Sequence, residues 1–164
     1  MASSEESDQQ KVGEAKAETG ERFTFFFGAE SPFSQWHSAV FAVDGVEYNC
    51  AEQYMMHRKA VLFADETLAA KIMASDHPRD QKALGRKVSN FNEETWKENC
   101  RDIVKRGNLA KFSQNDDLRA ELMKTRGTTL VEAAPGDTVW GIGLSATNWK
   151  AQHRQRWRGK KSVG

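Results

Sequence analysis

The chain has 164 residues, of which 24 are basic and 23 acidic, and its formal net charge is +1. This length suits one domain with a tail, and the hydrophobic and aromatic content is enough to form a core. No apolar run is long enough for a transmembrane helix, and the N-terminus lacks the apolar stretch of a secretory signal. The sequence therefore predicts an intracellular protein, in the cytoplasm or nucleus, with no membrane association.

The cysteine and histidine content argues against a disulfide or a metal site. Cys50 and Cys100 fit reduced thiols better than a disulfide in an intracellular protein. No group of cysteines and histidines has the spacing of metal ligands, so neither a metal nor a cofactor is expected. The four histidines are scattered along the chain and receive no catalytic role.

The two ends of the chain carry opposite charge. Residues 1–20 hold five acids against two lysines, without aromatic residues or periodicity, so a disordered acidic tail is expected over 1–21 and a folded domain over 22–164. All charged residues after Asp137 are basic: Lys150, Arg154, Arg156, Arg158, Lys160 and Lys161. This basic end is either a solvated tail or an attractor for phosphates and nucleic acid.

Two β features are expected near the start of the domain. Alternation from Phe23 to Phe27 predicts a buried strand that ends at Gly28. Residues 40–43 and 46–48 flank Asp44-Gly45, and this pattern predicts a hairpin because both turn residues tolerate a positive φ.

Helices are expected to follow, and their start signals are local. Asn49 is predicted to cap a helix over 51–63, Asp65 one over 66–74, and Asn92 a long one that breaks or bends near Gly107. Further helices are predicted from Pro78 to Arg86 and after Asn115, with a short strand at Leu130 and Val131. The expected fold is mainly α (α+β with small antiparallel β-hairpins) in a single compact domain, and no dinucleotide-binding, P-loop or nucleophile-elbow motif occurs.

The segment 51–59 is the richest in residues suited to catalysis. Glu52 and Lys59 are seven residues apart, so a helix places both on one face, together with Met55. A carboxylate and an amine that share an apolar stripe would be partly desolvated and electrostatically coupled. The alternative is that Glu52 merely stabilises the helix N-terminus while Lys59 is solvated.

A second cluster lies at 137–143. Two glycines there allow close backbone approach to a ligand, Trp140 offers a face for stacking, and Asp137 is able to accept hydrogen bonds from ribose hydroxyls. The alternative is a simple turn with a core tryptophan. Trp96 is a third candidate, although an aromatic residue on a helix more often belongs to the core.

Several segments of the chain resemble the NADAR/YbiA-like family in order and spacing, from about residue 25 to residue 144. They are Gly28, 33–36, 44–48, 51–55 with Lys59, 85–88, Trp96, 111–115, 130–135 and 137–144. The resemblance implies a mainly helical fold with small hairpins and N-glycosidase activity. Together these segments are far more specific than any one of them.

Two kinds of substrate are associated with this family. One is ADP-ribose on the exocyclic amino group of guanine, in DNA, RNA or a nucleotide, and the other is an early ribosylamino-pyrimidine phosphate of riboflavin synthesis. Both contain a ribosyl C1′ bonded to an exocyclic nitrogen. The basic end of the chain favours ADP-ribosylated guanine. The non-enzymatic alternative is a module that binds ADP-ribose without cleaving it. A general nucleic-acid-binding protein is the weakest hypothesis, because only the basic end of the chain supports it.

The resemblance also implies roles for individual residues. The family's essential glutamate falls on Glu52, its lysine on Lys59 and its aspartate on Asp137, and these three are expected to be catalytic. The expected substrate-binding residues are Gly28, Ser34, Gln53, Tyr54, Trp96, Trp140 and Gly141.

The predicted chemistry centres on the anomeric carbon of the ribose. Cleavage builds positive charge at C1′, and Glu52 would either stabilise this charge or relay a proton through water. Lys59 would either protonate the leaving nitrogen or form a Schiff base with the ring-opened sugar.

The chain departs from the family pattern at two places. Ser34-Gln35-Trp36 replaces the usual Ser-Asn-Phe/Trp and keeps an amide. The family usually ends in a Gly-Lys-Asn-x-Leu-Gly segment followed by a helix, whereas this sequence reads Gly159-Lys160-Lys161-Ser162-Val163-Gly164. Either the sequence is truncated or this member dispenses with that helix, and the family's ligand contacts there are not carried over.

Overall fold

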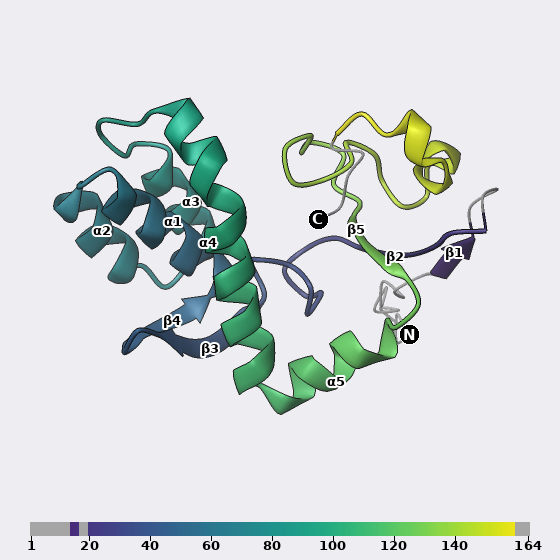
Figure 1. The fold of residues 1–164 in the computed structure, drawn as a ribbon, viewed down its shortest axis with the longest axis horizontal. Coiled ribbons are helices and arrows are strands. Elements are labelled where there is room, and N and C mark those ends of the chain that lie inside the picture. The colour runs from purple at the N-terminus through teal and green to yellow at the C-terminus, as the bar shows by residue number, and fades with distance from the viewer. Residues whose placement is uncertain (1–13, 17–19, 160–164) are drawn as a thin grey trace, which may run out of the picture. The chain divides into compact units, whose positions relative to one another are not determined.

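A computed structural model describes residues 14–16 and 20–159 (Figure 1). These residues form an α+β fold in which helices predominate, and the chain divides into two compact units. One unit is Gly28–Lys124, and the other combines Met1–Phe27 with Thr125–Gly164. The single domain predicted over 22–164 therefore contains two units.

The acidic tail predicted over 1–21 lies mostly outside the described residues, namely at 1–13 and 17–19. In its described part, Glu14–Lys16 form a short strand, β1, instead of the disorder expected from composition. The strand exists because it pairs antiparallel with Arg22–Phe26, so long-range pairing overrides the local sequence signal.

The β-hairpin of the helical unit confirms the prediction made from Asp44-Gly45. Strands β3 (Ser38–Val43) and β4 (Val46–Cys50) are antiparallel. The turn places Asp44 at φ 52° and Gly45 at φ 78°, the left-handed conformations that a tight two-residue hairpin turn requires.

Five α-helices follow in the described part of this unit: α1 (Ala51–Leu62), α2 (Glu66–Met73), α3 (Pro78–Gly85), α4 (Glu93–Gln114) and α5 (Asp116–Lys124). Two predicted caps are confirmed. Asp65 accepts a hydrogen bond from the backbone of Leu68 at 3.0 Å, and Asn92 accepts one from Thr95 at 2.9 Å. Each of these caps satisfies an amide that the first helical turn leaves without a partner.

The cap of α1 differs from the prediction. The Cys50 thiol, and not the Asn49 side chain, accepts the Gln53 backbone N–H at 3.4 Å. Asn49 still belongs to β4, and its side-chain amide donates to the Ser75 carbonyl at 3.2 Å. The strand therefore runs directly into the helix.

The helix predicted to break or bend near Gly107 does not break there, because α4 continues through this residue. A Cβ atom built on Gly107 would lie 2.4 Å from Cδ1 of Tyr54. The glycine is thus needed for the close packing of α4 against an aromatic ring, and the helix tolerates its conformational freedom.

Helix α1 lies at the centre of its unit and contacts α2, α3 and α4. Its apolar side chains contribute to two core clusters. One contains Met55, Met56, Ala60, Ile72 and Val88, with partly buried Trp96 and Val104 against it, and the other contains Phe41, Tyr48 and Tyr54.

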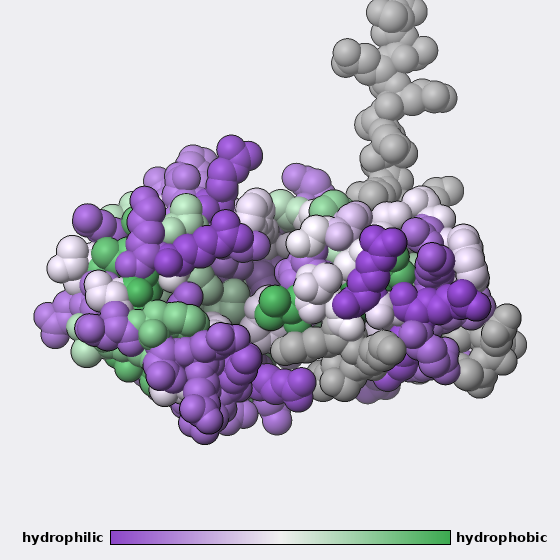
Figure 2. All heavy atoms as spheres, turned by 90° about the horizontal axis from the view of Figure 1, so that it is seen from above, coloured by the Kyte–Doolittle hydropathy of each residue, from purple (hydrophilic) through white to green (hydrophobic). Residues whose placement is uncertain are grey.

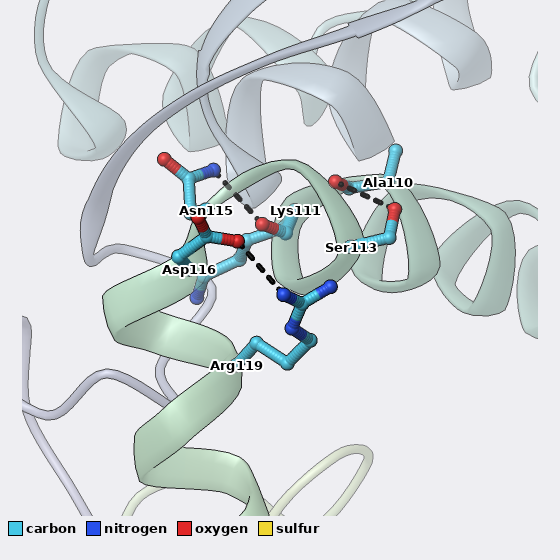
Figure 3. A network of polar contacts seen from close by, with 6 residues as sticks. All are labelled: Ala110, Lys111, Ser113, Asn115, Asp116 and Arg119. Atoms are coloured by element: carbon cyan, nitrogen blue, oxygen red, sulfur yellow. Dashed lines mark hydrogen bonds and ion pairs between the residues drawn. The ribbon is translucent and has the colours of Figure 1, made fainter.

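The turn from α4 to α5 is fixed by local polar contacts (Figure 3). Asn115 donates through its side-chain amide to the carbonyls of Lys111 at 2.8 Å and Val40 at 3.0 Å. Arg119 pairs with Asp116 at 2.9 Å across the first turn of α5. The contact with Val40 ties the helix junction to the hairpin.

The second unit is built on a three-stranded sheet in the order β1-β2-β5, with β2 at Arg22–Phe26 and β5 at Thr129–Glu132. The expectation of antiparallel hairpins alone is wrong here, because β2 and β5 are parallel. The whole helical unit lies between them in the sequence, and parallel strands need such a long connection. Two 3₁₀ helices follow, η1 (Trp149–Gln152) and η2 (Arg154–Arg156).

The core of this unit is formed by Phe23, Phe25, Val131, Ala133, Ile142, Leu144, Ala151 and Trp157. Elsewhere, Cys50 and Cys100 are both buried free thiols, as the sequence predicted. Within the described part of the chain, no helix combines the length and apolar character that crossing a membrane requires.

Candidate active site

Glu52 occupies the second position of α1, and its side chain is only 4% exposed. Its backbone N–H donates to the Gln35 carbonyl at 2.9 Å. A carboxylate in the first turn of a helix is stabilised by the helix dipole and the exposed amides of that turn. Burial of a carboxylate is otherwise costly, so the start of α1 holds an acid that is largely removed from water.

A buried lysine holds the segment that contacts Glu52. Lys111 is 0% exposed, and its Nζ donates to the carbonyls of Pro32 at 2.8 Å and Ser34 at 2.9 Å. Burial lowers the pKa of Lys111 to about 8. Through Gln35, this loop then accepts the amide of Glu52, so Lys111 helps to position the start of α1.

Lys59 lies two turns further along α1, which runs without interruption from Glu52. The side chain is half-buried, and burial lowers the pKa of the amine below its ordinary value. The Arg86 guanidinium lowers this pKa further, whereas the Glu52 carboxylate raises it. The direction of the Glu52 effect on Lys59 is the one expected for a carboxylate on the same helix face, and the catalytic roles of both residues stay predictions.

Two aromatic rings surround the Lys59 amine. Its Nζ lies 4.4 Å from the centroid of the Phe91 ring and 5.6 Å from that of Trp96. Trp96 is partly buried against the core, while Phe91 is 46% exposed and packs edge-on against Phe63 at 5.3 Å. The site thus combines a half-buried amine with a half-exposed aromatic ring over which the amine lies.

Gln53 and Tyr54 point into the interior. The Gln53 amide oxygen accepts the Asn49 N–H at 2.8 Å, and its nitrogen donates to the carbonyls of Ile72 and Ser75 at 3.2 and 3.3 Å. Tyr54 is 2% exposed and packs among core aromatic residues. The contacts of both side chains stabilise α1, and direct contact of either one with substrate stays a prediction.

Gly28 and Ser34 belong to the loop that precedes the hairpin. Gly28 has φ +86°, and a Cβ there would meet nothing within 4 Å. Ser34 is buried, and its hydroxyl accepts the Trp36 N–H at 3.1 Å. Gly28 therefore provides a left-handed turn with open space beside it, and Ser34 shapes the loop that Lys111 holds.

The second predicted cluster lies in the other unit and is described by itself. One oxygen of Asp137 accepts the backbone N–H groups of Val139 at 2.8 Å and Trp140 at 3.0 Å. A Cβ on Gly141 would lie 2.9 Å from the Ala134 Cβ. Asp137 thus forms the turn that presents the 36% exposed Trp140, and Gly141 is required by packing. Their substrate contacts stay predictions.

Three residues near the Glu52–Lys59 pair received no role from the sequence. Phe91 lies in a loop, where the sequence has no periodic pattern. Arg86 is one of many arginines and lysines in the chain, so its local sequence does not distinguish it. Lys111 had a signal, since it is four residues from Gly107 on the face of α4 that the helix buries. A lone lysine at an apolar-face position indicates a buried amine with backbone partners.

Comparisons with known proteins identify the family of the chain. The NADAR domain matches residues 25–164. The chain belongs to the NADAR family. This NADAR chain is 41% identical over 155 residues to N-glycosidase R617 of Acanthamoeba polyphaga mimivirus, covering 88% of this chain and 91% of that protein. It is 35% identical to Protein irg-1 of Caenorhabditis elegans, covering 87% and 74%.

A solved NADAR structure supports the fold. The NMR structure of the Escherichia coli protein YbiA matches with a TM-score of 0.65 and 27% identity, covering 74% of this chain and 72% of that one. In sequence, N-glycosidase YbiA of E. coli strain K12 is 30% identical over 117 residues. The family predicted from the segments in 25–144 is therefore confirmed, and the NADAR match extends to residue 164.

Proposed function

We propose that this NADAR protein is an N-glycosidase that hydrolyses the bond between a ribosyl C1′ and an exocyclic amino nitrogen. The observation that carries the proposal is the buried Glu52 carboxylate, electrostatically coupled to the desolvated amine of Lys59. Two relatives, which match 88% and 71% of this chain, are named N-glycosidases, and these names support the same reaction class.

Glu52 is the proposed stabiliser of the transition state. As the C1′–N bond lengthens, positive charge develops on C1′ and the ring oxygen. A carboxylate in a poorly solvated position stabilises this charge without reorganising, and its electrostatic stabilisation of the charge is much larger there than in bulk water. Water adds to C1′, and the amine leaves with a proton supplied by the enzyme or solvent.

Lys59 is the proposed second catalytic residue. An amine whose pKa is lowered by burial has a larger neutral fraction near neutral pH than an ordinary lysine. A neutral amine is able to attack C1′ of the ring-opened ribosylamine, releasing the base and leaving a Schiff base that water hydrolyses. Borohydride reduction during turnover would trap this adduct on Lys59, whereas a proton-donating Lys59 would leave nothing to trap.

The proposed substrate is guanine that carries ADP-ribose on its exocyclic amino group, in DNA, RNA or a nucleotide. The half-exposed Phe91 ring beside Lys59 is suited to contact with a planar base. As a separate argument from sequence alone, the basic residues after Asp137 favour a substrate that carries phosphates. Ribosylamino-pyrimidine phosphates contain the same bond and are the second candidate.

A panel of substrates tests the proposal. The purified chain would be incubated with an ADP-ribosylated-guanine oligonucleotide, the corresponding nucleotide and a ribosylamino-pyrimidine phosphate, and released base and sugar would be quantified. Release from at least one substrate is expected, with the fastest release from ADP-ribosylated guanine. Tight ADP-ribose binding without release from any substrate would identify a binding module and overturn the proposal.

A further inference from the structure

Residues 145–159 pack around a buried tryptophan. Trp157 is 3% exposed, and its ring N–H donates to the Ala151 carbonyl at 2.7 Å. Asn148 caps η1 by accepting the Lys150 N–H at 3.0 Å. These contacts fix the 3₁₀ helices η1 and η2, which carry a second tryptophan, Trp149, whose side chain is 57% exposed.

Cationic side chains surround the exposed ring of Trp149. The Arg156 guanidinium carbon lies 4.7 Å from the ring centroid and Lys150 Nζ lies 5.9 Å from it. The His153 ring packs edge-on at 5.6 Å. Trp149 thus combines a largely exposed aromatic ring with two cationic side chains that lie over it, which places a stacking surface and positive charge together.

The charge of this segment has one sign. No acidic residue follows Asp137 in the sequence. Arg154 pairs with Glu21 and lies against Phe23 and Trp157, so its charge is largely offset within the unit. Among the residues of this segment that the structure describes, Lys150, Arg156 and Arg158 are the basic side chains that remain for an external anion. Hydrophilic residues cover much of the molecular face seen in Figure 2.

We infer that Trp149, Lys150 and Arg156 form a binding surface for single-stranded nucleic acid. An unpaired base stacks on the Trp149 ring, and the adjoining phosphates contact Lys150 and Arg156. Base stacking on an aromatic ring requires a base that is free of its duplex partner, which is why a single strand fits better than a duplex. The surface binds unmodified strands, so the inference goes beyond the proposed hydrolysis and does not depend on it.

The test is fluorescence anisotropy of the full chain with dye-labelled, unmodified single-stranded DNA and RNA oligonucleotides over a range of salt concentrations. Wild type is expected to bind at low salt, with affinity falling as salt rises. Trp149→Ala should weaken binding by roughly tenfold, since stacking of one base contributes about 1–3 kcal/mol. Arg156→Gln should reduce the slope of log affinity against log salt by about one.

Matched controls use exposed residues of the helical unit. Leu109→Ala and Arg101→Gln remove an exposed apolar side chain and an exposed cation, and both should bind as wild type does. Trp149→Phe keeps a stacking ring and should bind more tightly than Trp149→Ala, which separates stacking from folding. Glu52→Gln should bind like wild type, so loss of catalysis and loss of binding remain distinguishable.

Two results would overturn the inference. One is wild-type affinity in Trp149→Ala together with an unchanged salt slope in Arg156→Gln. The other is competition by polyglutamate as strong as that by an unlabelled oligonucleotide. Polyglutamate carries negative charge without bases, so this result would show that the surface binds any polyanion. Binding of either oligonucleotide with the expected variant effects supports the inference. The oligonucleotide that binds more tightly shows whether the surface prefers DNA or RNA.

Discussion

The Nζ atom of Lys59 lies 4.4 Å from the centroid of the Phe91 ring. The amine thus lies over a ring that is 46% exposed, and burial lowers the pKa of Lys59. Phe91→Ala should let water reach the amine and raise this pKa toward its ordinary value. If Lys59 is a nucleophile, activity rises with pH through this pKa; if it is an acid, activity falls.

In both cases Phe91→Ala should move that limb of the pH–rate profile to higher pH. The measurement is kcat against pH for wild type, Phe91→Ala and the control Leu109→Ala, whose side chain is exposed on α4. A limb at the same pH in wild type and Phe91→Ala would show that the ring does not control the amine.

Lys111 gives a prediction for stability. Its pKa of about 8 lies below the ordinary 10.5, so the unfolded state binds more protons between these values and the contribution of Lys111 to stability rises with pH. Below about pH 8 both states are protonated, and the cost of burying the charge is present in full. The free energy of unfolding of wild type minus that of Lys111→Met should therefore increase by about 2–3 kcal/mol from about pH 7 to pH 10.

Urea unfolding of both proteins at several pH values measures this difference. Methionine is similar in length and carries no charge, so the comparison isolates the titration of the amine. A difference that stays constant or falls with rising pH would contradict a lowered pKa at Lys111.

Gly107 is predicted to be intolerant of a side chain. Alanine favours helices over glycine by about 1 kcal/mol, but its Cβ would lie 2.4 Å from Tyr54 Cδ1. Overpacking should win, so Gly107→Ala is expected to lower the free energy of unfolding by about 1–3 kcal/mol. Gly136→Ala, where a Cβ meets nothing within 4 Å, should change it by less than about 0.5 kcal/mol. Equal stability of the two variants would refute the packing argument.

Gln53 separates a structural role from a binding role. Gln53→Leu leaves the Asn49 amide and the Ile72 carbonyl without their side-chain partner. The free energy of unfolding should fall by about 2–4 kcal/mol, while KM of the folded enzyme stays near wild type. Thermal unfolding and steady-state kinetics on one preparation measure both quantities. A stable variant with a greatly raised KM would instead support direct contact with substrate.

Features encoded within a few residues were predictable from the sequence. The Asp44-Gly45 turn and the caps at Asp65 and Asn92 depend on neighbouring backbone groups, so their residue types are sufficient to identify them. The common face of Glu52 and Lys59 follows from helical geometry alone.

Features that depend on distant partners were not predictable. Cys50 caps α1 because β4 runs into the helix, and α4 continues through Gly107 because Tyr54 packs there. The parallel pairing of β2 with β5 joins strands separated by the whole helical unit. Phe91 and Lys111 acquire their contacts with the site only in the folded chain. No local pattern specifies these partners, because tertiary packing selects them.

The role of the Glu52 carboxylate is tested most directly by the single-turnover rate of Glu52→Gln on an ADP-ribosylated-guanine oligonucleotide, with substrate affinity measured in parallel. Glutamine keeps the shape but removes the charge, so the rate should fall by about 100- to 1000-fold while Kd changes little. Glu66→Gln, in the first turn of α2, is the control and should match wild type. A Glu52→Gln rate close to that of wild type would contradict the account.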